Sequence, residues 1–254
     1  MAEQHRLLRP NPFAGDTGEI EPELAKAFAQ PLANRATAVV AALTTGRVVL
    51  PISPHAQPAD IAALTAGKLP VADEATTESG CASELELNSS IPEVAYPGGA
   101  TALPVFSSAA QLASWGGEYR PLLLKTRAAA ALALQRYDGQ MVLDPQSSQQ
   151  TWLGRSVTVA WITEMPWIAP WADPELASYL ANIAEIDQAV AVEVHAGLQG
   201  AAVIQLGVPP ASAARQMLLA AVQKITTALG EDTYLKARFD VVEIRPETLE
   251  SSVD

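Results

Sequence analysis

The chain contains three histidines, His5, His55 and His195, whose spacing bears on metal binding and acid–base catalysis. A zinc site takes three or four ligands from His, Cys and acidic side chains, often grouped at short spacing. None of these histidines has another His or a Cys close to it in sequence, and no HExxH motif is present. The sequence therefore predicts no metal ion and no cofactor, and it predicts histidines that are solvated or locally hydrogen-bonded.

Nucleophilic chemistry also lacks its usual residues. The single cysteine, Cys81, lies in TESGCASE, where neighbouring acids raise a thiol pKa and disfavour the reactive thiolate. The serines form no GxSxG or SxxK motif. No GxGxxG follows a predicted strand, and no phosphate-binding GxxxxGK[ST] occurs. We therefore predict no catalytic residues.

Charge argues against two classes of partner. The chain carries 28 acidic residues against 16 Lys and Arg, for a net charge of −12. A nucleic-acid-binding protein neutralises phosphates with clustered basic residues, and anionic lipid attracts basic segments in the same way. Here the basic residues are scattered, so we expect neither nucleic acid nor a membrane surface as a partner.

Cysteine usage and the apolar segments bear on the compartment. One cysteine permits no intramolecular disulfide, which fits a reducing environment. The N-terminal residues lack the apolar core of a secretory signal. The longest apolar stretch, residues 36–52, is interrupted by Gly46 and Arg47 and falls short of the ~20 residues that a membrane span needs. These features predict a cytoplasmic protein.

The aromatic residues are the most informative side chains. Four of the five tryptophans fall within twenty residues, and a methionine lies among them: Trp152, Trp161, Met165, Trp167 and Trp171. Large aromatic residues and Met are enriched in interface cores. They either pack between two domains or over the first sheet, or they form a surface for a partner. Trp167 and Trp171, which lie among prolines, are expected to be the more exposed pair.

The elements that would position these residues begin with a first, mixed set. We expect helices at 23–29, 33–45, 108–115 and 126–137, and strands at 47–52, 91–95, 101–106, 122–124, 141–143 and 156–163. Ser108 and Gln111 have the spacing of a capping box. The acidic, Ser- and Thr-rich stretch 73–84 is predicted to be a mobile loop.

A second set follows the Trp- and Pro-rich stretch 163–176. Asp173 and Pro174 are typical of a helix start, with the acid at the N-cap and the proline at the first helical position. We expect helices at 174–186 and 211–229, and strands at 190–195, 201–206 and 239–244. This order predicts a small antiparallel sheet with helices on one face.

The predicted fold is α+β, with two lobes that each hold a small mixed or antiparallel sheet packed with helices. We expect a flexible N-terminal arm at 1–32 and a first domain at 33–166, with a mobile acidic loop near 70–86. A C-terminal α-β-β-α-β domain is expected at 172–248.

Two short segments are similar to a known family. Leu103–Ser108 (LPVFSS), followed by Leu112 and Trp115, resembles the LPVFTS signature of the SseB family's N-terminal domain in its actinobacterial form. Met141–Pro145 (MVLDP) resembles that family's LVLDP strand and turn. The resemblance extends over residues 33–163. It departs from the family at Ser108, where Thr is common, and in lacking basic residues before the LPVF strand.

The resemblance implies a protein of uncertain biochemical role, and because the family has no agreed catalytic residues, it supplies none for this chain. We interpret the two segments as fold determinants. The leading functional hypothesis is a non-enzymatic interaction or regulatory protein with an unidentified protein partner or self-association. The alternative is a small-molecule-binding protein or cryptic enzyme with a site between the two lobes, where pockets often form.

Overall fold

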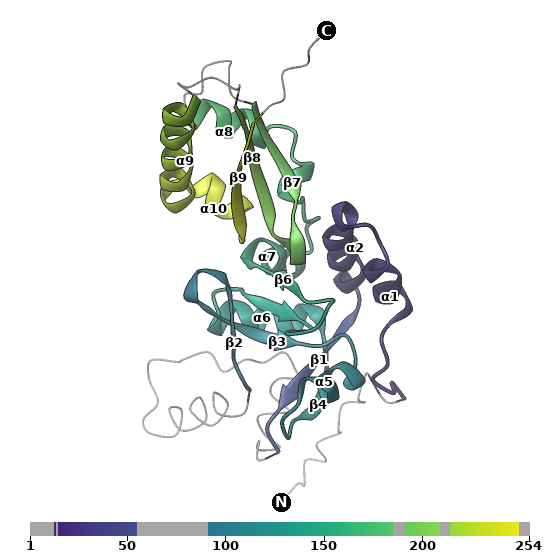
Figure 1. Ribbon diagram of the computed structural model, residues 1–254. Coiled ribbons are helices and arrows are strands. Elements are labelled where there is room, and N and C mark those ends of the chain that lie inside the picture. Colours follow the sequence, from purple (N-terminus) through teal and green to yellow (C-terminus); the bar gives the residue numbers. More distant parts are fainter. Residues whose placement is uncertain (1–12, 14, 55–90, 185–190, 209–213, 249–254) are drawn as a thin grey trace, which may run out of the picture.

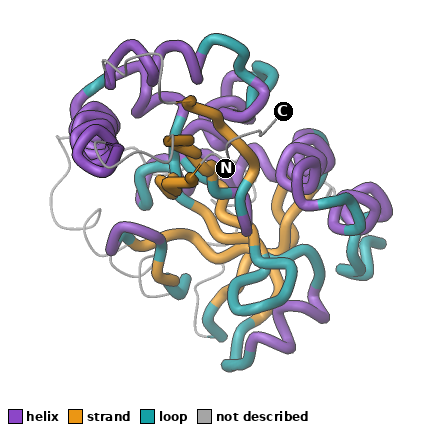
Figure 2. Tube along the Cα trace, turned by 45° about the horizontal axis from the view of Figure 1, so that its top comes forward, coloured by secondary structure: helices purple, strands orange, loops and turns teal. Residues whose placement is uncertain are grey.

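The structure, a computed structural model, describes residues 13, 15–54, 91–184, 191–208 and 214–248. The expected acidic loop at 73–84 lies outside these residues, as do His5, His55 and Cys81. The described residues form two lobes, with helix α7 (Arg155–Thr163) lying where they meet (Figure 1). In a second view the strands occupy the middle of the molecule and helices surround them (Figure 2). The α+β prediction is confirmed.

The first lobe is built on two small sheets. Its helices are α1 (Pro22–Phe28), α2 (Leu32–Thr44), α5 (Ala109–Trp115), α6 (Thr126–Arg136) and α7. Its strands are β1 (Arg47–Ile52), β2 (Val94–Ala95), β3 (Thr101–Val105), β4 (Arg120–Lys125), β5 (Met141–Leu143) and β6 (Thr151–Leu153). The 3₁₀ turn η1 (Pro97–Gly99) joins β2 to β3, and its Pro-Gly-Gly sequence is typical of a turn.

The two sheets are joined by a bridge between β1 and the residue that follows β3. One pairs β1 with β4 antiparallel, and the other has the order β2-β3-β5-β6, in which only β3 and β5 are parallel. Val49 and Phe106 exchange two backbone hydrogen bonds of 2.8 Å, which connect β1 to the end of β3. The strands therefore form one continuous surface for the helices to cover.

Period-two alternation distributes the side chains of this surface between two faces. One face packs into the main core with α1, α2, α6 and α7, and it contributes Val48, Leu50, Leu103, Val105, Met141, Leu143 and Leu153. The opposite face holds two smaller clusters, one under α5 around Phe106 and Leu112, and one around Tyr96 and Val142. Both faces of the strands are therefore packed against apolar side chains.

The predicted arm at 1–32 differs from the structure in its second half. Helix α1 buries Leu24, Ala27 and Phe28 in the main core. Just before it, the Asp16 carboxylate pairs with the guanidinium of the buried Arg47, with Arg47 Nε 2.7 Å from Asp16 Oδ2. Apolar burial and this ion pair hold residues 16–28 on the lobe. The polar composition of the segment had led to the prediction of a flexible arm.

The signature segments lie side by side in the sheet. Ser108 accepts a hydrogen bond from the Gln111 backbone N–H at 3.1 Å and caps α5, as predicted. Asp144, which follows β5 and is fully buried, accepts from the Ser107 backbone N–H at 2.8 Å. Burial raises the pKa of the Asp144 carboxyl more than the hydrogen bonds from Ser107 lower it. Both segments thus stabilise the ends of the parallel strands.

The second lobe holds one three-stranded sheet. It comprises α8 (Leu176–Ala184), β7 (Ala191–Ala196), β8 (Ala202–Val208), α9 (Ala214–Glu231), α10 (Thr233–Arg238) and β9 (Val242–Thr248), with the 3₁₀ turns η2 (Pro170–Ala172) before α8 and η3 (Leu198–Gly200) between β7 and β8. The prediction of an antiparallel sheet is wrong in part, because β9 pairs parallel to β8. The connection through α9 and α10 returns the chain to the end of the sheet where β8 begins, so β9 runs the same way.

The helices of the second lobe cover one face of its sheet. Leu176, Leu180, Ile225 and Leu235 from the helices pack against Ile204 and its neighbours in a second core. The predicted helix start at Asp173 and Pro174 is two residues early: α8 begins at Leu176, and Asp173 Oδ1 accepts from the Glu175 backbone N–H at 3.1 Å in the turn before it. Each lobe thus has a separate core.

The predicted strand at 156–163 is wrong: these residues form α7, and β6 just before them was not predicted. No helix in the described residues combines the length and apolar character that a membrane crossing requires.

Candidate functional site at the lobe junction

The junction is centred on the start of α7. The N-cap residue of this helix is Gly154, which has no side chain to accept a hydrogen bond. A carboxylate from the second lobe takes that role: Asp240 Oδ1 accepts from the Ser156 backbone N–H at 3.1 Å, and the Arg155 backbone N–H also donates to Asp240. The first backbone N–H groups of a helix need such an acceptor. One lobe therefore caps a helix of the other.

Gly154 is required by space rather than by backbone conformation. Its φ of −90° and ψ of −170° are open to any residue. A Cβ built on Gly154, however, would lie 2.1 Å from the Asp240 carboxyl carbon and 2.4 Å from Oδ1. Only a glycine lets the Asp240 carboxylate approach the helix end this closely.

A chain of side-chain hydrogen bonds extends from Asp240. The Ser156 hydroxyl donates to Asp240 Oδ2, and it accepts from the indole Nε1–H of Trp167 at 3.0 Å. Trp167 belongs to the connector, which we define as residues 164–174 between α7 and α8. The carboxylate of the second lobe is thus linked to the connector through a helix of the first.

Burial is the main cause of the altered pKa values of the titratable groups at the junction. Although Asp240 as a whole is exposed, protein atoms surround its carboxylate, and this desolvation raises its pKa more than the Ser156 and Arg155 donors lower it. The buried Tyr96 hydroxyl has no hydrogen-bond partner in the described part of the chain. Its own burial, and then the charge of Asp240, raise the pKa of Tyr96 far above its usual range.

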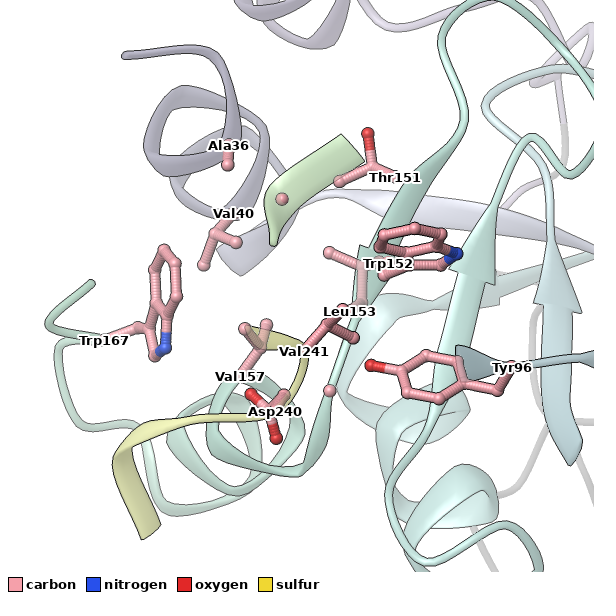
Figure 3. A pocket seen from close by; sticks show the side chains of 12 residues that line it. Ala36, Val40, Tyr96, Thr151, Trp152, Leu153, Val157, Trp167, Asp240 and Val241 are labelled. Carbon is pink, nitrogen blue, oxygen red and sulfur yellow. The ribbon is translucent and has the colours of Figure 1, made fainter. Parts of the chain in front are cut away.

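A cavity lies where the lobes touch (Figure 3). Its walls come from both lobes and include Tyr96, Trp152, Val157, Trp167, Asp240 and Val241. Its volume is about 20 Å³, enough for about one water molecule. The cavity therefore does not accommodate a metabolite.

Two glycines allow the lobes to approach each other closely. Beside Gly154, a Cβ on Gly200 of η3 would lie 3.0 Å from the Trp152 carbonyl oxygen of β6. Gln150 Nε2 also donates to Gln199 Oε1 at 3.2 Å across the junction. Val241 adds an apolar contact, because it packs on the cluster around Tyr96.

The structure divides the five predicted site residues into three groups. Trp161, 4 % exposed, lies in the main core and donates through Nε1 to the Val40 carbonyl at 3.3 Å. Trp152 faces the opposite side of the sheet and packs beside Tyr96. Both are structural residues of the first lobe.

Trp167 and Trp171, expected to be the more exposed pair, are both half-buried. Trp167 packs on the core of the first lobe and Trp171 on the core of the second. Their rings meet edge to face, with centroids 5.9 Å apart. They therefore link the two cores, because each ring has a different core beneath it.

Met165 and its neighbour Ile168 are the exposed members of the connector. Met165 is 65 % exposed and Ile168 47 %. Glu164 ends α7 with a left-handed φ of 58° and pairs with Arg127, and the Met165 N–H bonds the Ala160 carbonyl at 3.0 Å. This turn directs the chain off the helix and leaves Met165 at the surface.

The second lobe also presents a sheet face that none of the described helices covers. His195 and Glu193 interact there, with Nε2 2.9 Å from Oε2, beside an open hollow of about 520 Å³ lined by Gln205, Arg245 and Glu247 among others. No three His, Cys, Asp or Glu side chains of the described residues gather as metal ligands. The face is solvated and polar, as predicted for His195.

Sequence reasoning missed Gly154, Ser156, Tyr96 and Asp240, which make the junction. The one local signal was the Leu-Gly-Arg-Ser order at 153–156, in which a glycine stands where a helix would begin. Asp240 lies 84 residues from Ser156, so nothing local to α7 could indicate its role.

Comparison with known proteins identifies the first lobe. A family model described as "SseB protein N-terminal domain" matches residues 22–157, which is more than half of the 254-residue chain. The match includes both signature segments and confirms the resemblance found in the sequence. It begins at α1, earlier than the resemblance did, and ends within α7. No curated protein and no solved structure matches the chain.

Proposed function

The chain belongs to the SseB family, and we propose that it is a non-enzymatic, cytoplasmic interaction protein that binds a protein partner through the exposed side of α7 and the connector. We call this surface the α7–connector patch and define it by Val159, Met165 and Ile168. It binds by apolar contact and carries out no chemistry.

The observation that carries the proposal is where exposed apolar side chains concentrate. Among the described residues, seven large apolar side chains are exposed, and three of them are the α7–connector patch, within ten residues of chain. Single exposed apolar residues are ordinary, whereas a concentration next to half-buried tryptophans is typical of interaction sites. Met is suited to such a surface because its unbranched side chain adapts to different partners.

The alternative of a small-molecule site or cryptic enzyme between the lobes has less support. The cavity at the junction holds about one water molecule. The hydrogen bonds of Asp240 and Ser156 are satisfied by the helix end and by Trp167, which leaves neither side chain directed at a substrate. The arrangement supports a structural role for these polar groups.

The test is a quantitative affinity purification from the native host, followed by binding measurements with the purified partner. Wild type is compared with Met165→Asp/Ile168→Asp and with the matched control Leu219→Asp, at a site 61 % exposed on α9. We expect one protein to be enriched by wild type and by the control, and its affinity to fall at least ~10-fold in the double variant.

Thermal unfolding serves as the fold control, because all three substitutions are at exposed positions and are expected to leave the melting temperature nearly unchanged. Equal binding by the double variant and the wild type contradicts the proposal. Sedimentation of the purified chain identifies the case in which the partner is a second copy.

A further inference from the structure

A helix of one lobe is completed here by an acid of the other, and the connector is tied to the same acid. We propose that Asp240 is a latch that holds the two lobes together and, through Ser156 and Trp167, sets the conformation of the connector. The latch thereby regulates the α7–connector patch, and only this last step rests on the proposed function.

The first support is that α7 depends on the other lobe for its cap. Helices α5 and α10 are each capped by their own N-cap residue: Ser108 caps α5, and Asp232 caps α10, where Oδ1 accepts from the Leu235 N–H at 3.0 Å. α7 instead begins at a glycine. When Asp240 moves away, the first N–H groups of α7 lose their acceptor, so lobe separation and fraying of α7 are linked.

The second support is the kind of polar contact that the described residues of the two lobes make with each other. Each has its own core, and the described parts of the two sheet-bearing lobes are joined by side-chain hydrogen bonds of Asp240 with Ser156 and of Gln150 with Gln199. The Gln pair is exposed and neutral, and it is therefore the weaker of the two. The carboxylate at a helix N-terminus also gains from the helix dipole.

The third support is the path from the latch to the patch. Trp167 points inward, and its indole N–H donates to the Ser156 hydroxyl, which in turn donates to Asp240. Met165 and Ile168, on either side of it, are exposed. Because one short segment carries both the inward and the outward residues, release of Trp167 changes the position of Met165 and Ile168.

The latch is tested by measuring the distance between the lobes. Spin labels are placed at Ser114→Cys on α5 and Gln223→Cys on α9, both exposed positions, with Cys81→Ser in the background. Double electron–electron resonance then gives the distance distribution in the full chain. We expect one narrow distribution in this parent, and a broadened, longer one in Asp240→Ala.

A second variant separates lobe coupling from helix stability. Gly154→Asp combined with Asp240→Gly moves the cap from the second lobe to α7's own N-cap position. We expect this swap to recover the helicity and melting temperature that Asp240→Ala loses, yet to keep the broad distance distribution. It also keeps the test usable if Asp240→Ala does not fold.

Two results overturn the latch. One is a narrow, parent-like distribution in Asp240→Ala, and the other is a narrow distribution in the cap swap, since either shows that other contacts hold the lobes. Gly154→Ala breaks the same contact by a change in the first lobe, because its Cβ displaces the Asp240 carboxylate. It must broaden the distribution as well.

The regulatory step has its own readout. Affinity for the partner identified with the α7–connector patch is measured for the cap swap, in which no patch residue is changed. We expect at least a ~5-fold loss, and unchanged affinity overturns the regulatory step. If Met165→Asp/Ile168→Asp binds like wild type while the cap swap still broadens the distance distribution, the proposed function fails and the latch stands.

Discussion

Helices α5 and α7 follow strands of the same sheet in the first lobe, yet they obtain their N-caps differently. The cap of α5 is Ser108, which accepts a hydrogen bond from the backbone N–H of Gln111, three residues along the chain. The cap of α7 is Asp240, 84 residues along the chain from Ser156 and in the other lobe. A local cap stabilises one helix, whereas a distant cap stabilises a helix and a domain contact together.

The residues of α7 explain why it depends on that contact. Its sequence, RSVTVAWIT, is rich in β-branched residues, which have lower helix propensity and alternate as a strand would. The helix forms because Val157, Ala160 and Trp161 are buried on the first core and because Asp240 satisfies its N-terminus. Tertiary packing overrides local preference here, whereas in α5 the two agree.

The strongest way to break the comparison is to fill the space at Gly154. We expect Gly154→Ala to lower the free energy of unfolding by about 2–3 kcal/mol, because the added Cβ meets the Asp240 carboxyl and displaces the cap. Urea unfolding measures the change.

The matched control for Gly154→Ala is Gly230→Ala near the end of α9, where an added Cβ meets nothing within 4 Å. There the same substitution is expected to stabilise by about 0.5 kcal/mol, since alanine favours the helix. If both substitutions have the same sign, close approach at Gly154 is not what the position requires.

Removing the distant cap is the next largest effect. Asp240→Ala is expected to cost about 2 kcal/mol, since hydrogen bonds to a charged acceptor are lost and two helix N–H groups lose their partner. Asp240→Asn keeps one acceptor for the Ser156 N–H and should cost less than half as much. Equal losses in the two variants would mean that the charge, rather than the cap, carries the contact.

Removing the local cap has a smaller effect. Ser108→Ala is expected to cost about 1 kcal/mol, because one neutral hydrogen bond to Gln111 is lost. It should leave the distance between the lobes unchanged, whereas Asp240→Ala should lengthen it. Urea unfolding and the spin-label distance measure the two quantities, and a change in lobe distance with Ser108→Ala contradicts the distinction.

The smallest expected effect is a pH dependence of the free energy of unfolding that arises from Asp144, next to the cap of α5. Asp144 holds the Ser107 N–H just before the α5 cap, and burial raises the pKa of its carboxyl. Its contribution to stability is therefore complete below the unfolded pKa of about 3.9 and is lost as the pH rises through the folded pKa.

The check is urea unfolding of wild type and Asp144→Asn from about pH 4 to about pH 8. As the pH rises, the unfolding free energy of the wild type should fall relative to that of Asp144→Asn, whatever the difference between them at pH 4. A constant difference would show that the carboxyl titrates alike in the folded and unfolded chain.

Much of the fold could be predicted because its causes are local. Capping of α5 by Ser108, the Pro97–Gly99 turn and the apolar strand Arg47–Ile52 all follow from neighbouring residues. The family resemblance was found in the same way, from the strand ends at Leu103–Ser108 and Met141–Pro145, and the family match confirms it.

The candidate site was predicted only in part. Clustering of the tryptophans indicated a contact region, and Trp167 and Trp171 do meet there. Their exposure was not predictable, because it depends on two cores approaching the connector from opposite sides. The exposed side chains proved to be Met165 and Ile168.

Composition, turn residues, caps and periodicity are short-range properties, and they were sufficient for the α+β class, most helices and strands, and the family. The helical state of Arg155–Thr163, the parallel pairing of β9 and the role of Gly154 depend on residues far apart in the chain. The state of Arg155–Thr163 and the role of Gly154 were decided only when the two lobes packed together, because Asp240 supplies the acceptor that completes α7. The pairing of β9 was decided inside the second lobe, where α9 and α10 return the chain to the start of β8.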